Sequence, residues 1–252
     1  MRGEVSVDER ESELLSRPST FTPLKVEFRL ATPIALSYPY LNFDGLIAHL
    51  WLRAKLGDKY RTLPTKRVIN FEYGPDFPLE PFEVDGRRIY RASVSLIDTE
   101  NPEEAFSVLK VKVTKIYKRF HQRNLDLEKL KIKSIHIGSG YFRNFIISIP
   151  YVPAKRVIFY ANADPEKLEY LLDGLVGLGK KTAIGFGMIR SFKITDIGED
   201  YSITKNGYSM RPIPKEFLKS YEELIPLAYK PPYWYSRNIT LCAPPFTKVE
   251  VV

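Results

Sequence analysis

The chain has 252 residues, of which 44% are hydrophobic and 27% are charged, so it can bury a real core and is neither disordered nor fibrous. Lysine and arginine number 38 against 30 aspartates and glutamates, which gives a formal net charge of +8. This excess favours a polyanionic partner, meaning a nucleic acid or an anionic membrane face, over a cationic one.

The reactive residue types exclude several kinds of site. A single cysteine, Cys242, excludes a disulfide framework and any site built from several cysteines. The three histidines, His49, His121 and His136, are widely spaced, so we expect no metal and no cofactor. The first residues lack the apolar run of a signal peptide, and no apolar stretch reaches the length of a membrane span. We therefore expect a cytoplasmic protein with no membrane partner.

The first part of the chain predicts a lead-in, a strand and a helix. Residues 1–21 are polar and predict a flexible lead-in, whereas residues 24–30 alternate apolar and charged side chains, as in a half-buried strand. Asn42 or Asp44 can cap a helix that continues to about Leu56. The apolar stripe of this helix consists of Phe43, Leu46, Ile47, Leu50 and Ala54. His49 and Arg53 lie outside the stripe.

The middle of the chain predicts a hairpin, a second helix and more strands. Asp85-Gly86 lies between two strand-like runs, which indicates a hairpin. Asp164, Pro165 and Glu166 supply an N-cap, a proline at the first helical position and an acid in the first turn of a helix. Further strands are predicted over residues 109–113, 142–149, 156–160 and 186–194.

This order of elements predicts an α+β fold with the ferredoxin-like (RRM-like) βαββαβ arrangement. We expect residues 22–197 to form that domain, with a long basic insertion at about residues 98–145. Residues 198–252 contain seven of the 19 prolines. They predict a proline-rich C-terminal extension that packs on the same domain.

A glycine-rich loop lies between the second helix and the last strand. Gly177, Gly179, Gly185 and Gly187 fall within eleven residues, and Lys180-Lys181 adds two charges between them. Glycines at this density allow positive φ and close approach to a ligand. Successive N–H groups in such a loop can form an anion-binding nest. The alternative is a tight connection without a ligand.

Two phosphate and RNA signatures match this loop only in part. Gly174, Gly179 and Lys180 have the spacing of a P-loop, but Lys181 stands where a serine or threonine must hold Mg²⁺. The loop also follows a helix, whereas a P-loop follows a strand. Residues 185–187 match only the centre of the RNA-recognition signature. We therefore expect no nucleotide hydrolysis.

The glycine spacing between the last helix and the last strand resembles the glycine motif of the RAMP superfamily of CRISPR-associated RNA-binding proteins. The resemblance to this superfamily spans about residues 22–197. Residues 44–48, 231–234 and 242–245 are most similar to the type IV Csf-class subunit that caps the 5′ handle of CRISPR RNA. The resemblance implies an antiviral ribonucleoprotein complex. Its expected partners are the single-stranded 5′ handle of CRISPR RNA and neighbouring backbone and large subunits.

The predicted insertion concentrates the positive charge. Residues 105–145 contain ten lysines and arginines and only two acids, so their net charge of +8 equals that of the whole chain. We expect Lys110 and Lys112 to share one strand face, with Val111 and Val113 on the other. Interleaved aromatic residues suit base stacking beside phosphate contacts, although a solvated outer face is the alternative.

The residues predicted to contact RNA combine the glycine loop, the insertion and one helical arginine. They are Gly177, Gly179, Lys180, Lys181, Gly185, Gly187, Arg53, Lys110, Lys112, Lys115, Lys118, Arg119, Arg123 and Arg143.

The resemblance also raises a catalytic alternative, because several RAMP relatives are metal-independent RNA endonucleases that use histidine. His49, which follows Tyr38 and Tyr40, is the best candidate for proton transfer here, ahead of His121 and His136. The leading hypothesis is a non-catalytic RNA-binding subunit that grips the 5′ handle. The alternatives are a CRISPR RNA-processing endoribonuclease using His49 and an RNA-recognition module outside CRISPR.

Overall fold

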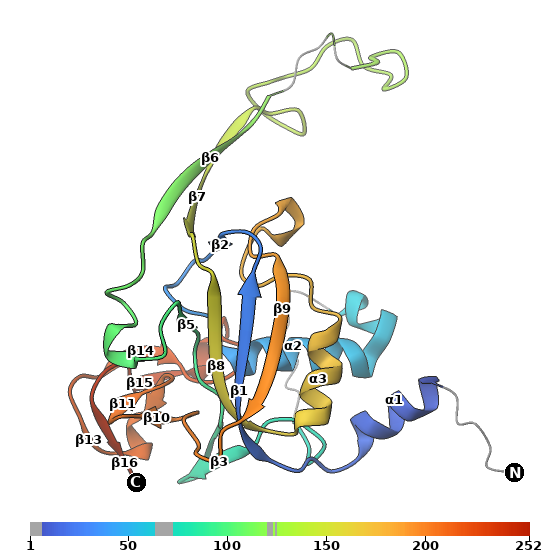
Figure 1. Cartoon of the computed structure of the whole chain (residues 1–252). Helices are drawn as coiled ribbons and strands as arrows, with labels where there is room; N and C mark the ends of the chain where they lie inside the picture. The colour runs from blue at the N-terminus through green and yellow to red at the C-terminus, as the bar shows by residue number, and fades with distance from the viewer. Residues whose placement is uncertain (1–6, 64–72, 120–122, 124) are drawn as a thin grey trace, which may run out of the picture.

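A computed structural model describes residues 7–63, 73–119, 123 and 125–252, and Figure 1 shows their arrangement. The helices are α1 (Val7–Ser16), α2 (Phe43–Leu56) and α3 (Pro165–Asp173). The strands up to residue 197 are β1 (Thr22–Leu30), β2 (Ile34–Ala35), β3 (Pro81–Val84), β4 (Arg87–Tyr90), β5 (Leu96–Ile97), β6 (Lys112–Lys118), β7 (Phe145–Val152), β8 (Arg156–Ala163) and β9 (Ile189–Asp196). The later strands are β10 (Thr204–Lys205), β11 (Tyr208–Ser209), β12 (Ile213–Pro214), β13 (Leu218–Tyr221), β14 (Ile225–Ala228), β15 (Ile239–Ala243) and β16 (Val249–Val251). Strands outweigh helices, which is compatible with the α+β class.

The centre of the molecule is an antiparallel sheet in the order β5-β8-β1-β9. α2 lies in the chain between β1 and β5, and α3 connects β8 to β9. The prediction of a half-buried strand over residues 24–30 is confirmed by β1. Leu24, Val26 and Phe28 are buried there, because the alternation places them all on the face that the helices cover.

The helix-covered face holds the largest core. Side chains from β1, β8, α2 and α3 meet in it, and Phe43 of α2 stacks on Phe159 of β8 with ring centroids 4.6 Å apart. The predicted apolar stripe of α2 points into this core, with Phe43, Ile47 and Leu50 buried and Leu46 and Ala54 partly buried. The predicted α3 is also confirmed, since Asp164 accepts a hydrogen bond from Lys167 N as its N-cap.

The predicted hairpin at Asp85-Gly86 is confirmed by the pairing of β3 with β4. Both turn residues have positive φ, 50° and 74°, which is the backbone that an Asp-Gly turn provides. The hairpin packs against the C-terminal segment, where Ile89 of β4 joins a core cluster with Ile213, Phe217 and Cys242.

The C-terminal segment covers the other face of the sheet at β5 and β8. Leu96, Ile158 and Tyr160 face away from the helices and pack with Met210 and Phe246 of that segment. The segment consists of short strands linked by turns, which the sequence did not reveal. Strands of two to five residues are too short to produce a readable alternation.

A buried ion pair joins α2 to the C-terminal segment. The Arg211 Nη2 atom lies 3.0 Å from Asp44 Oδ2, and both residues are 1% exposed. The hydroxyl of Tyr233 donates to Asp44 Oδ1 at 2.6 Å. The interpretation of Asp44 as a helix cap is therefore wrong. Helix α2 begins at Phe43 with Asn42 as its N-cap, and Asp44 points into the interior.

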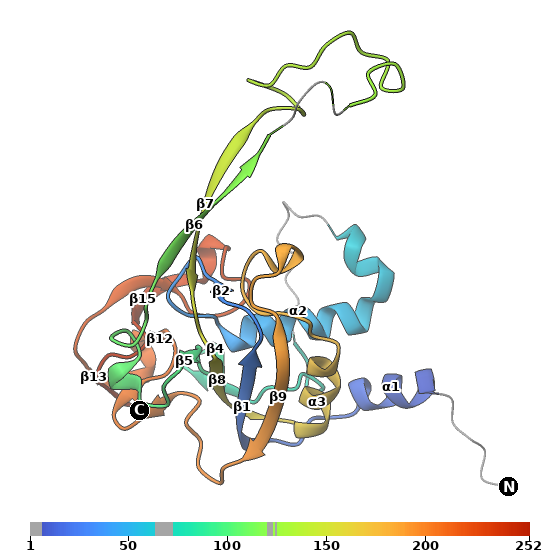
Figure 2. The same cartoon turned by 45° about the horizontal axis from the view of Figure 1, so that its top comes forward.

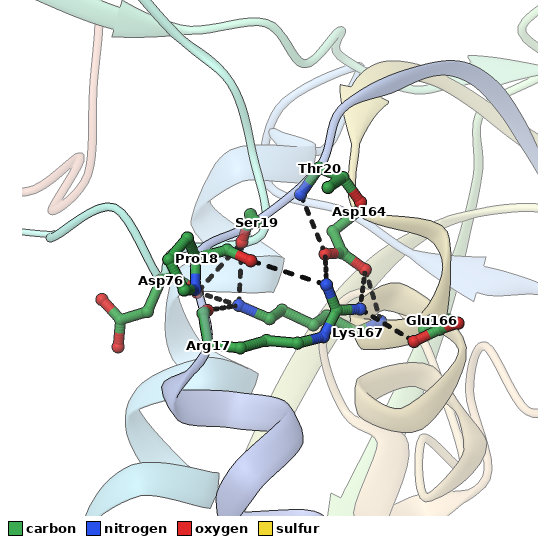
Figure 3. A network of polar contacts seen from close by, with 8 residues as sticks. All are labelled: Arg17, Pro18, Ser19, Thr20, Asp76, Asp164, Glu166 and Lys167. Atoms are coloured by element: carbon green, nitrogen blue, oxygen red, sulfur yellow. Dashed lines mark hydrogen bonds and ion pairs between the residues drawn. The ribbon is translucent and has the colours of Figure 1, made fainter.

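The N-terminal segment is more ordered than the lead-in predicted over residues 1–21. α1 packs Leu15 into the main core, and the chain after it is fixed to the start of α3 (Figure 3). The buried Lys167 ammonium donates to Arg17 O at 2.6 Å, Ser19 Oγ at 2.9 Å and Asp76 O at 2.8 Å. Arg17 also forms an ion pair with Asp164. Burial lowers the Lys167 pKa from its ordinary value.

The chain between β5 and β8 forms a long projection. β6 pairs with β7 along its whole length, and the hairpin rises away from the central sheet (Figures 1 and 2). We call β6, β7 and the residues between them the arm. Its foot is attached to the body through β2, which pairs with Tyr151 and Val152 at the end of β7. Among the described residues, no helix combines the length and apolar character needed to cross a membrane.

Candidate nucleic-acid interface

The glycine loop is fastened to the turn that links β1 to β2. Lys180 N donates to Ala35 O at 2.8 Å, and Gly187 N donates to Pro33 O at 2.7 Å. Figure 2 shows this loop beside the β1–β2 turn, below the arm. The loop therefore has a fixed position at the foot of the arm.

Two of its four glycines, Gly179 and Gly187, are required by the packing of the chain itself, and Gly177 is closely packed. A Cβ atom on Gly179, where φ is +80°, would lie 2.6 Å from Ala35 O. A Cβ on Gly187 would overlap the carbonyl of Leu178, and one on Gly177 would meet Thr182 Cγ2 at 3.0 Å. Only at Gly185, with φ +92°, would the added atom meet nothing within 4 Å. Internal packing thus explains Gly179 and Gly187 without a ligand, and the positive φ of Gly185 favours glycine there whatever the space around it.

Most N–H groups of the glycine loop do not form the expected anion-binding nest. Hydrogen bonds to carbonyls of the chain occupy the N–H groups of Leu178, Lys180, Ile184, Gly185, Phe186 and Gly187. A bound phosphate would therefore meet mainly the side chains of Lys180 and Lys181, both of which are exposed. Lys181 has a left-handed backbone with φ of 62° at the tip of the loop.

The arm carries its basic residues on both faces. Lys112, Thr114, Ile116 and Lys118 share one face of β6, because alternate residues point the same way. Lys115 lies on the other face, between Val113 and Tyr117. Lys110 is exposed and precedes the strand. Val111 and Val113 are 61% and 62% exposed, so the side of the chain opposite Lys112 is also open to solvent.

Aromatic rings accompany the cations toward the outer end of the hairpin. The Lys118 ammonium lies 5.4 Å from the ring centroids of both Tyr141 and Phe145. The Arg119 guanidinium lies 5.5 Å from the ring centroid of Tyr117. Such pairs leave ring faces and cations close together, which is the combination that binds single-stranded nucleic acid.

The outermost predicted contacts belong to the chain between β6 and β7. Arg123 and Arg143 are both exposed there. His121 and Phe120 lie outside the described residues. The exposed ring of Tyr141, 82% accessible, is the most solvent-exposed large aromatic side chain in the described part of the chain.

The glycine loop and the arm meet at one place. Ala35 of β2 bridges to Lys180 on one side and pairs with Tyr151 of β7 on the other. The rings of Tyr151 and Phe186 lie 6.0 Å apart between centroids. The fold thus brings together two basic features that are separated in the sequence.

Arg53 and His49 lie on α2 as a separate group. The His49 Nδ1 atom lies 2.6 Å from the hydroxyl of Tyr60, and partial burial, followed by the Arg53 charge, lowers the His49 pKa below its usual value. Burial raises the Tyr60 pKa. Sequence reasoning had looked to Tyr38 and Tyr40 and missed Tyr60. Tyr60 lies beyond the end of α2, in the 3-10 turns of Gly57–Thr62, so helical spacing in the sequence gave no signal for this contact.

Within the described ranges, no cluster of three or more histidine, cysteine, aspartate or glutamate side chains could hold a metal ion. The single cysteine, Cys242, is buried, and burial raises the pKa of its thiol to about 12. It is therefore a packing residue with no accessible thiolate.

Comparison with known families finds a match over most of the chain. The model of the family described as CRISPR type IV associated protein Csf3 matches residues 22–245. The matched region contains the glycine loop, the arm and the Asp44–Arg211 ion pair. A search of the curated proteins finds no match.

Proposed function

From the premise that the chain belongs to the Csf3 family of CRISPR type IV associated proteins, we propose that it is a non-catalytic RNA-binding subunit of a type IV effector ribonucleoprotein. In this role it grips the single-stranded 5′ handle of the CRISPR RNA in the cytoplasm. The observation that carries the proposal is the junction at β2, where Lys180-Lys181 and the basic arm adjoin.

The architecture supports assignment to the RAMP superfamily. A ferredoxin-like βαββαβ domain has its strands in the spatial order 4-1-3-2, all antiparallel, with a helix in each crossover. β9, β1, β8 and β5 follow that order here, and α2 and α3 occupy the crossovers. In this interpretation residues 22–197 are the RAMP domain, the arm is its insertion, and residues 198–252 are an extension of the same domain.

Charge and exposure support RNA as the ligand. The arm and the loop present lysines and arginines to solvent beside exposed rings, which suits phosphate contacts together with base stacking. Phosphate contacts release counterions, so they make affinity depend on salt.

The C-terminal segment supplies a surface for a neighbouring backbone or large subunit. The outer face of the β14–β15 pair is apolar and open: Leu241 and Ile239 are 49% and 48% exposed, and Pro226 pairs with Leu241. Exposed apolar faces of this kind are typical of protein interfaces. Replacing Ile239 and Leu241 with serine should release the chain from the co-expressed complex without changing its RNA affinity.

The decisive experiment measures RNA affinity against salt. Replacing Lys110, Lys112, Lys115 and Arg119 with alanine should weaken binding of 5′-handle RNA and flatten the salt dependence. The expected change is about 0.7 log units of affinity per log unit of salt for each phosphate that the variant no longer neutralises.

A control variant removes the same charges elsewhere. Lys59, Arg61, Lys215 and Lys219 are exposed residues of the body, and their replacement by alanine should leave the slope nearly unchanged. Equal slopes in the wild type and the arm variant would refute the role of the arm. RNA without the 5′ handle tests whether the grip is specific for it.

The glycine loop is tested through its side chains. Replacing Lys180 and Lys181 together with alanine should lower RNA affinity with little change in melting temperature, because both side chains are exposed. Unchanged affinity would mean that the loop is only a connector.

A second candidate function is a metal-independent endoribonuclease, which the contact between His49 and Tyr60 favours. A neutral imidazole beside a phenol could move a proton at the 2′-hydroxyl of RNA. Cleavage of repeat RNA that is abolished in His49→Ala and reduced in Tyr60→Phe would establish it. No cleavage by the wild type would leave the non-catalytic role.

A further inference from the structure

A proline-rich loop between β14 and β15 holds a tryptophan in solvent on a rigid support. Trp234 is 64% exposed. The residue before it, Tyr233, is anchored to Asp44, and its ring packs where a Cβ on Gly45 would meet it at 3.2 Å. The Asn238 side-chain amide donates to Lys230 O at 3.3 Å and to Pro232 O at 3.2 Å. The indole therefore needs little further ordering when it binds a partner.

A second exposed ring lies on the segment of chain that runs from the contact with the glycine loop to the contact with Tyr233. Tyr38 is 72% exposed and belongs to the short connection from β2 to α2. At the start of this connection, Ala35 O accepts the hydrogen bond from Lys180 N. At its end, Asp44 binds Tyr233. Ala35 and Asp44 are separated by nine residue steps, so they lie within about 30 Å of each other even in a fully extended chain.

The three segments that carry these rings and lysines contain no acid. None of the 30 acidic residues falls within residues 31–43, 174–195 or 224–249. The same segments supply Lys180, Lys181, Lys230 and Arg237. The Arg237 guanidinium lies 5.9 Å from the ring centroid of Tyr235, the residue that follows Trp234 in the chain. These segments combine open aromatic rings with cations and contribute no repelling carboxylate of their own, which complements a polyanion.

We propose that Tyr38 and Trp234, together with Lys180 and Lys181, form a track for single-stranded RNA. Bases stack on the two rings while phosphates meet the lysines. Stacking tolerates any base, because every base has a π face, so the track holds the strand without reading its sequence. This inference rests on the proposed RNA-binding function and extends the interface from the glycine loop to the C-terminal segment.

The two tryptophans allow a direct test by fluorescence. Trp51 is buried, at 8% exposure, so a Trp51→Phe variant leaves Trp234 as the sole indole. Titration with a single-stranded RNA of about eight nucleotides, within the usual range of single-strand sites, should quench this fluorescence to saturation. RNA binding seen by anisotropy without any quenching would overturn the proposal.

Substitutions supply the second measurement. Trp234→Ala and Tyr38→Ala should each weaken binding of the same RNA about 5- to 150-fold, the range that one stacked base contributes. Trp234→Phe should retain most of the affinity, because it keeps an aromatic face. Val252→Ser, which removes an exposed apolar side chain that has no ring and lies outside the proposed interfaces, is the control and should bind normally. All four variants should melt like the wild type, since these side chains are exposed.

The possible outcomes distinguish the RNA track from the RNA-binding function on which it rests. If Lys180→Ala with Lys181→Ala weakens RNA binding but Trp234→Ala does not, the track is wrong and the RNA-binding role stands. If Trp234→Ala leaves RNA affinity intact and instead releases the other protein subunits of the co-expressed complex, the loop is a protein-docking site and the track is again wrong. If the wild type binds no single-stranded RNA, both proposals fall.

Discussion

Strands β1 and β6 have the same kind of sequence and opposite environments. Apolar residues alternate with charged ones over residues 24–30 in β1 and over residues 109–113, which lead into β6. In β1, Val26 is fully buried beneath α2 and α3. In β6, Val113 is 62% exposed, because no layer covers that face of the arm in the described structure.

The difference shows what alternation encodes. It fixes which side chains share a face, but it does not say whether another element will cover that face. In the body the covered face drives folding, whereas in the arm both faces remain available for a partner. Stability and binding should therefore separate between the two regions.

The largest expected contrast concerns buried and exposed charge. Asp44→Ala would leave the Arg211 guanidinium buried without its counter-ion, and we expect a loss of about 3–5 kcal/mol in the free energy of unfolding. Lys115→Ala, in the arm, should change it by less than about 0.5 kcal/mol. Urea denaturation measures both. Similar losses in the two variants would contradict the division between body and arm.

Glycines with positive φ offer the next contrast. Gly179 faces the body, where a Cβ would meet Ala35 O at 2.6 Å, while Gly140 near the end of the arm has nothing within 4 Å. Gly140→Ala should cost about 1–2 kcal/mol for its backbone conformation alone. Gly179→Ala should cost about 1–3 kcal/mol more, because the β2 backbone must shift. Thermal unfolding of the two variants checks the order, and an equal cost would mean that β2 yields easily.

The two valines form a matched pair. Val26→Ala should destabilise the protein by about 2–3 kcal/mol, since it removes buried methyl groups from the main core. Val113→Ala should have an effect within about 0.5 kcal/mol. A substantial loss from Val113→Ala would show that the arm is packed against something in solution. Denaturation at several protein concentrations would show whether that is a second copy.

The smallest effect is a pH dependence at the rim of the body. The His49 pKa is lowered by partial burial and by Arg53, so between that pKa and 6.5 the unfolded chain binds more protons than the folded one. The contribution of neutral His49 to the free energy of unfolding is therefore complete above pH 6.5. It is lost as the pH falls through the pKa of His49 in the folded protein. An NMR titration of His49 should give a midpoint below 6.5, and Arg53→Ala should raise it. A midpoint at or above 6.5 would contradict the account.

Local features of the sequence determined several elements. The alternation in β1, the Asp-Pro-Glu start of α3 and the Asp85-Gly86 turn each rest on neighbouring residues, and the structure confirms them. The glycine loop was also located correctly between α3 and β9. The expected reason for its glycines was incomplete, because Gly179 and Gly187 are fixed by contacts with Ala35 and Leu178.

Tertiary structure alone decided the rest. The pairing of Asp44 with Arg211 joins residues 167 positions apart, and the meeting of Lys180 with β2 joins residues almost as distant. Such contacts leave no periodic trace, because the partners are set by the path of the chain through space. For the same reason the sequence could indicate the two faces of β1 and β6 but not which face the helices would cover.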